Sequence, residues 1–113
     1  MTSPDLQGKV SFIMPKISMA TTHNLGREEA ARRLKEKFNV VREHYGSHVN
    51  NLWENWTDHT FSFGFKAMGM GITGTVQVED ASVKLNANLP LAAMLFKGSI
   101  ERQIRQELNG LLA

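Results

Sequence analysis

Residues 100–112 read IERQIRQELNGLL, and their apolar positions recur at the spacing of one helical face. The side chains on this face are Ile100, Ile104, Leu108 and Leu111. Charged side chains fill the opposite face. A helix of this length is only marginally stable alone, so its apolar face must be buried against another part of the chain. The spacing therefore predicts a closing helix that covers the segments before it.

Those earlier segments have the two-residue alternation of β-strands. In residues 16–22, Ile17, Met19 and Thr21 share one side, and the residues between them share the other. Later runs place polar, mostly uncharged side chains opposite an apolar side, which is typical of an antiparallel sheet with one solvated face. The later candidate strands are residues 52–56, 61–65, 72–78 and 83–89.

A second helix is predicted over residues 25–45, where the residues of one apolar face recur at helical spacing, at Ala30, Leu34, Phe38, Val41 and Tyr45. Asn24 is positioned to cap its first turn, and Gly46 to end it in a left-handed conformation. After Pro90, residues 91–113 supply the closing helical segment, with a bend expected at Gly98.

These elements predict an α+β fold, an antiparallel β-sheet of about four strands with two α-helices on one face. The expected order is β-α-β-β-β-α, similar to a pared-down helix-grip fold. We expect residues 16–113 to form a single α+β domain and residues 1–15 to be an N-terminal extension or an edge strand.

Composition narrows the class of protein. The 113 residues are 42% hydrophobic and 21% charged, with a net charge of +2 and no cysteine. These values are typical of a globular protein and exclude disulfides and thiolate chemistry. No run is long enough to span a bilayer, and no secretory signal is apparent, so a cytoplasmic location is expected. Basic residues alternate with acidic ones around Lys37, which argues against nucleic-acid binding.

Histidines are the main candidates for chemistry. His44 and His48 have the spacing of two metal ligands on one helical face, with His59 and Asp58 as conceivable third ligands, but surface histidines at a helix end and in a loop explain them better. His23 lies at a strand-to-helix junction, where a structural hydrogen bond is favoured over catalysis. No nucleophile or phosphate loop accompanies them. We therefore expect no metal and no cofactor, and a non-enzymatic role is favoured over an enzyme, for which His23 and His59 would be the candidate acid–base residues.

Three aromatic rings, Phe61, Phe63 and Phe65, share the side of a strand that the helices should cover. This placement favours a core over a stacking platform for nucleic acid, which would need an open, basic face. Trp53 and Trp56 should point to opposite sides of their strand, which leaves one of them open to solvent.

Apolar residues exceed what the predicted core needs at two places. Met68 and Met70 lie near a hairpin tip, and Leu95 and Phe96 lie near the start of the closing helix. Either the helix entrance covers the hairpin within one molecule, or these residues form a surface for a partner, a hydrophobic granule or a second copy of the chain.

Three motifs resemble the polyhydroxyalkanoic acid system family. They are HNLG at residues 23–26, GITGTV at 71–76 and LFKGSIERQI at 95–104, and the similarity covers about residues 16–113. The resemblance implies a bacterial cytoplasmic protein associated with polyhydroxyalkanoate storage granules. It carries no catalytic signature.

Two functions follow as hypotheses. The first is a non-enzymatic accessory or binding protein that uses Met68, Met70, Leu95 and Phe96 to contact a polyhydroxyalkanoate granule, a granule-associated protein or a second copy. The alternative is a domain that binds an acyl or hydroxyacyl chain between the closing helix and the face of Phe61, Phe63 and Phe65.

Overall fold

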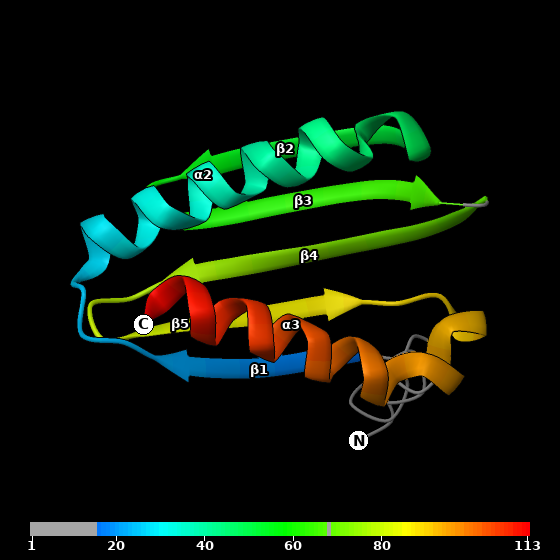
Figure 1. Ribbon diagram of the computed structural model, residues 1–113. Helices are drawn as coiled ribbons and strands as arrows, with labels where there is room; N and C mark the ends of the chain where they lie inside the picture. The colour runs from blue at the N-terminus through cyan, green and yellow to red at the C-terminus, as the bar shows by residue number, and fades with distance from the viewer. Residues whose placement is uncertain (1–15, 68) are drawn as a thin grey trace, which may run out of the picture.

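The computed structural model describes residues 16–67 and 69–113, which form a five-stranded antiparallel sheet with two long helices on one face (Figure 1). The α+β class and the two helices are as predicted, but the sheet has one strand more than the four expected. The predicted extension at residues 1–15 lies outside the described residues. In chain order the elements are β1 (Lys16–Thr22), α2 (Arg27–Tyr45), the 3₁₀ helix η1 (Gly46–His48), β2 (Asn50–Thr57), β3 (Thr60–Ala67), β4 (Met70–Val78), β5 (Ser82–Asn88), the 3₁₀ helix η2 (Leu91–Phe96) and α3 (Lys97–Leu112).

The strand order is β1-β5-β4-β3-β2, so β1 and β2 lie at opposite edges of the sheet. Strands β2 to β5 form a meander in which each strand pairs with the next. Strand β1 then pairs with the far side of β5, from Lys16 opposite Asn88 to Thr22 opposite Ser82. Helix α2 therefore carries the chain from one edge of the sheet to the other. Among the described residues, neither helix has a stretch long and apolar enough to span a membrane.

The core lies between the sheet and the two helices, as the apolar face of residues 100–112 predicted. Ile17 and Val83 are completely buried on the helix-covered face. Leu108 from α3 packs into the cluster around Ile17, and Leu112 packs into the cluster around Val83. The alternation in β1 is followed closely, since every second residue from Ile17 to Thr21 is buried.

The helix ends differ from those predicted. Helix α2 begins at Arg27, and the residue before it is Gly26 with φ +80°, so Asn24 does not cap the helix. At the other end Gly46 has φ −58° and leads into η1, so it is not a left-handed stop. The break in the closing segment falls at Lys97, where η2 gives way to α3, and not at Gly98.

His23 holds the start of α2 in place and has the structural role expected for it. The side chain is buried, and the Leu25 backbone N–H donates to its Nδ1 at 3.1 Å. Since Nδ1 accepts this bond, the proton of the neutral ring is on Nε2, which donates to the Glu79 carbonyl at 3.1 Å. His23 thereby joins the β1–α2 junction to the turn between β4 and β5.

Candidate functional site

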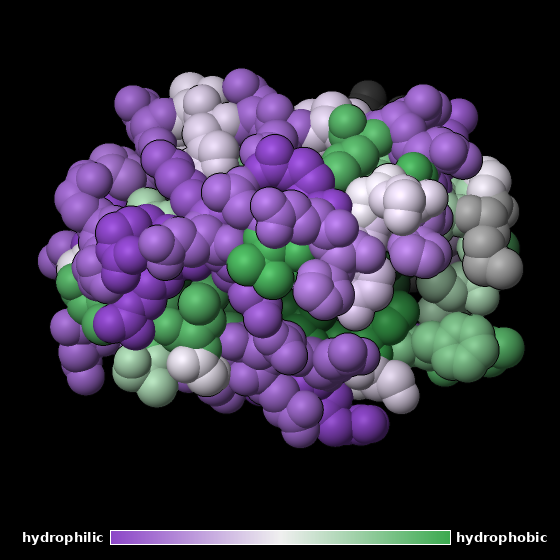
Figure 2. Space-filling model, turned by 45° about the horizontal axis from the view of Figure 1, so that its top comes forward, coloured by the Kyte–Doolittle hydropathy of each residue, from purple (hydrophilic) through white to green (hydrophobic). Residues whose placement is uncertain are grey.

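The two helices cover different parts of the sheet and leave a groove between them. Helix α2 lies over β2 and β3, α3 lies over β5 and β1, and β4 is visible between them without a helix above it (Figure 1). The groove has a volume of about 490 Å³ and is lined mainly by apolar side chains. Figure 2 shows hydrophobic atoms set between hydrophilic side chains on this side of the molecule.

The floor of the groove is one row of side chains across three strands. Phe61 of β3 is opposite Val76 of β4, and Val76 is opposite Leu85 of β5. In the neighbouring row, Phe63 is opposite Gly74. Because Gly74 has no side chain, the Phe63 ring lies over the backbone there, with its Cζ 2.6 Å from the place that a Cβ of residue 74 would occupy.

Aromatic rings form the wall of the groove on the α2 side. Phe38 of α2 meets Phe61 edge to face, with ring centroids 4.4 Å apart and an interplanar angle of 70°. Phe63 stacks on Phe61 at 5.7 Å. Such pairs prefer fixed relative orientations, so the Phe38 ring of this wall is held in place against Phe61 and Phe63 of the floor.

Toward the C-terminal end of α2 the two helices are farther apart (Figure 1), and apolar side chains remain open to solvent. Val41 is 38% exposed and Tyr45 is 58% exposed, although both lie on the apolar face of α2. On the α3 side, Ile100 and Ile104 are only partly buried. Part of the helical face predicted as core therefore lines an open groove instead.

The other end of the groove is closed by hydrogen bonds between the helices. Arg33 of α2 donates from Nη1 to the carbonyl oxygens of Leu111, at 3.1 Å, and Ala113, at 3.0 Å. Glu29 holds the Arg33 guanidinium at 2.8 Å. Hydrogen bonds from Arg32 and Arg33 lower the pKa of Glu29 to about 2, so this carboxylate stays charged and keeps Arg33 oriented.

One ion pair crosses the rim of the groove. Lys37 Nζ of α2 lies 2.8 Å from Glu107 Oε1 of α3, and both residues line the groove. They are the charged members of the lining, and the other polar member from α3 is Gln103. The groove thus has an apolar floor and a single paired cation and anion at its rim.

Residues 17–112 match the family model described as "Putative polyhydroxyalkanoic acid system protein". The chain belongs to this family. No curated protein and no solved structure gives a match to the chain. The family description links the chain to the polyhydroxyalkanoic acid system, and in this family member the groove is lined mainly by apolar side chains.

Only some of the residues predicted for a binding surface come together in this family member. Phe61 is buried and Phe63 is partly buried, and both line the groove. Phe65 is partly buried on the same strand but outside the groove lining. Met70 is partly buried at the start of β4, and Met68 lies outside the described residues. The sequence reasoning missed Phe38, whose helical spacing marked it only as core.

Helix η2 exposes the other predicted surface. Leu95 is 90% exposed and Phe96 is 62% exposed, so the hairpin of β3 and β4 does not bury them. Leu91 and Met94 of the same short helix are also exposed. We call these four residues the η2 patch. It lies next to the first residues of α3, outside the groove.

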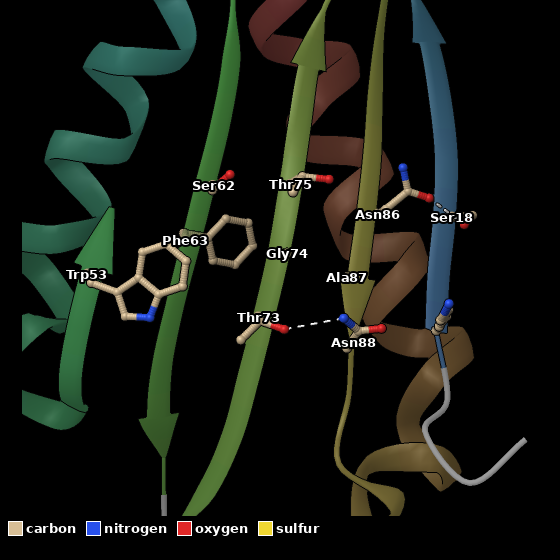
Figure 3. Close-up of a pocket in the computed structure, with 11 residues that line it drawn as sticks. Ser18, Trp53, Ser62, Phe63, Thr73, Gly74, Thr75, Asn86, Ala87 and Asn88 are labelled. Carbon is tan, nitrogen blue, oxygen red and sulfur yellow. Dashed lines mark hydrogen bonds between the residues drawn. The ribbon is translucent and has the colours of Figure 1, made fainter. Parts of the chain in front are cut away.

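The uncovered face of the sheet is polar, as the alternation predicted. Figure 3 shows Trp53 beside serine, threonine and asparagine side chains from the neighbouring strands. These side chains bond to one another, with Ser18 Oγ donating to Asn86 Oδ1 at 2.7 Å and Asn88 Nδ2 donating to Thr73 Oγ1 at 3.3 Å. The two tryptophans point to opposite faces as predicted, because Trp53 pairs with Gly64 and Trp56 with Phe61.

Within residues 16–67 and 69–113, no group of three or more potential ligands could hold a metal ion. His44 and His48 are both exposed, one in the last turn of α2 and one in η1. His59 instead pairs with Glu28 at 2.7 Å. None of these three histidines lines the groove.

Proposed function

We propose that this chain is a non-enzymatic binding protein of the polyhydroxyalkanoate system, and that it holds an acyl or hydroxyacyl chain in the groove between α2 and α3. The observation that carries this proposal is the volume of about 490 Å³ above an apolar floor of Phe61, Val76 and Leu85. Small-molecule sites commonly have volumes of about 300–1,000 Å³.

The shape of the groove supports an extended ligand. Lining residues run along α2 from Leu34 to Tyr45, a distance of about 16 Å at the rise of an α-helix. Burial of an alkyl chain there would contribute about 0.8 kcal/mol for each methylene group removed from water. An aliphatic chain suits this lining because most of its contacts are apolar side chains.

The first test uses N-phenyl-1-naphthylamine, an uncharged dye whose fluorescence increases in apolar sites. We expect saturable dye binding to the wild type and displacement by 3-hydroxydecanoic acid. Val41→Asp should weaken dye binding at least about tenfold, because a charge in the groove wall must be desolvated when the groove is filled.

Val40→Asp is the matched control, because Val40 is exposed on the same helix but does not line the groove. It should leave dye binding unchanged. Equal effects of the two substitutions, or a wild type that binds no dye, would contradict the proposal.

A second function is favoured by the exposure of the η2 patch. We propose that Leu95 and Phe96 contact the surface of a polyhydroxyalkanoate granule or a granule-associated protein. Two large apolar side chains next to each other on one short helix are costly to leave in water, so a surface that covers them gains free energy.

Co-sedimentation with purified polyhydroxyalkanoate particles tests the η2 patch. The wild type should sediment with the particles, and Leu95→Ser/Phe96→Ser should lower the partition constant at least about tenfold, because two apolar side chains no longer leave water. Ala92→Ser, at another exposed position in η2, should have no effect. Unchanged sedimentation of the double variant would refute this role, and a halved solution mass of that variant would assign the patch to a second copy of the chain.

A further inference from the structure

We infer that Lys37 is the residue that binds the carboxylate of the alkyl ligand, and that Glu107 forms an ion pair with Lys37 when the groove is empty. This inference rests on the proposed function, because it concerns the same groove. It adds the chemical class of the ligand, a monocarboxylate with an alkyl tail, and the residue that selects it.

The position of Lys37 supports this assignment. The residue lines the groove one turn of α2 away from Leu34 and next to Phe38, whose ring forms the aromatic wall. Its ammonium group is therefore at the rim, while the apolar floor lies below. A ligand whose tail lies on Phe61 and Val76 could reach this cation with a terminal anionic group.

The contact with Glu107 shows which chemical group binds to the Lys37 ammonium group. The Glu107 carboxylate lies 2.8 Å from Lys37 Nζ, a distance typical of a charge-assisted hydrogen bond. A ligand carboxylate presents the same two oxygens and the same charge. The ion pair thus already contains the interaction that the ligand would make, with a protein side chain in the ligand's place.

Replacement of the Glu107 carboxylate by the ligand carboxylate at Lys37 costs little free energy. Both side chains of the pair are well exposed, and exposed ion pairs contribute little to stability. Arg33 keeps the two helices joined at Leu111 and Ala113, so loss of the Lys37–Glu107 contact does not separate them. Ligand binding can therefore open the rim without disturbing the core.

The experiment compares decanoate with the uncharged 1-decanol as displacers of N-phenyl-1-naphthylamine. Lys37→Gln should weaken decanoate binding about three- to fivefold and leave 1-decanol unchanged, because only the carboxylate loses its cation, in an exposed pair. Glu107→Gln should change decanoate binding in the opposite direction and strengthen it several-fold, because Lys37 then has no competing carboxylate.

Arg105→Gln is the matched control. Arg105 is exposed on α3 and does not line the groove, so this substitution removes one positive charge without changing the site. It should leave both affinities unchanged. If Arg105→Gln weakens decanoate as much as Lys37→Gln does, the effect is one of net charge and the inference is wrong.

The remaining outcomes separate this inference from the proposed function. If 1-decanol displaces the dye but the Lys37 and Glu107 variants bind decanoate with wild-type affinity, the groove binds alkyl chains and the carboxylate assignment fails. If Lys37→Gln weakens both displacers equally, Lys37 contributes packing and the assignment also fails. If neither compound displaces a bound dye, the proposed function itself fails.

Discussion

Ile17→Ala should lower the free energy of unfolding by about 2–4 kcal/mol, the range for a large aliphatic side chain removed from a packed core. Ile17 is completely buried and belongs to the cluster that includes Leu85 and Leu108. Its partner across the strands is Ala87, which is too small to fill the space left behind. Thermal unfolding followed by circular dichroism should show a Tm lower by about 10–20 °C.

Ala20→Ser is the control for this measurement. Ala20 belongs to the same strand but is exposed on the opposite face of the sheet. Its replacement should change stability by less than about 0.5 kcal/mol. A wild-type Tm for Ile17→Ala would mean that α3 does not cover β1, and the architecture would need revision.

Gly74→Ala should destabilise the protein by about 1–3 kcal/mol through overpacking. The added Cβ would lie 2.6 Å from Phe63 Cζ and 2.9 Å from the backbone oxygen of Asn86. The phenyl ring can rotate away, but the oxygen belongs to the neighbouring strand and cannot. Urea unfolding measures the loss, and displacement of the Phe63 ring should also weaken dye binding in the groove.

Gly71→Ala is the matched substitution in the same strand. No atom lies within 4 Å of the Cβ that it would add, and it has no positive φ. It should be neutral or stabilise the fold by up to about 1 kcal/mol, because alanine restricts the unfolded chain. Equal destabilisation by both substitutions would show that strand propensity, and not the contact with Phe63, explains the effect at Gly74.

Local periodicity predicted the elements well because each strand or helix repeats its own burial pattern. β1 has the predicted bounds, and Leu108 is buried as the spacing of the closing helix required. The helix ends were less predictable, because their partners are distant in sequence. The first turn of α2 is held by Asp80, whose Oδ1 accepts from the Arg27 N–H at 3.4 Å. The sequence around Asn24 does not reveal this contact, because Asp80 is 53 residues away from Arg27.

The groove was only partly predictable for a geometrical reason. Spacing identifies the apolar face of each helix, so Phe38 and Val41 were correctly placed on one face of α2. It does not give the separation of two helices on a sheet, which depends on the strands that each helix covers. For the same reason the pairing of Lys37 with Glu107, from two separate helices, has no signal in either segment alone.

The Arg33 contacts with Leu111 and Ala113 have a consequence for ligand range. Because these hydrogen bonds join the two helices at one end, α3 can rotate about that end. A small rotation would widen the opposite end of the groove without breaking any hydrogen bond between strands. If the groove holds the alkyl chain proposed above, this arrangement would accept tails of different lengths and select mainly by the carboxylate that Lys37 contacts.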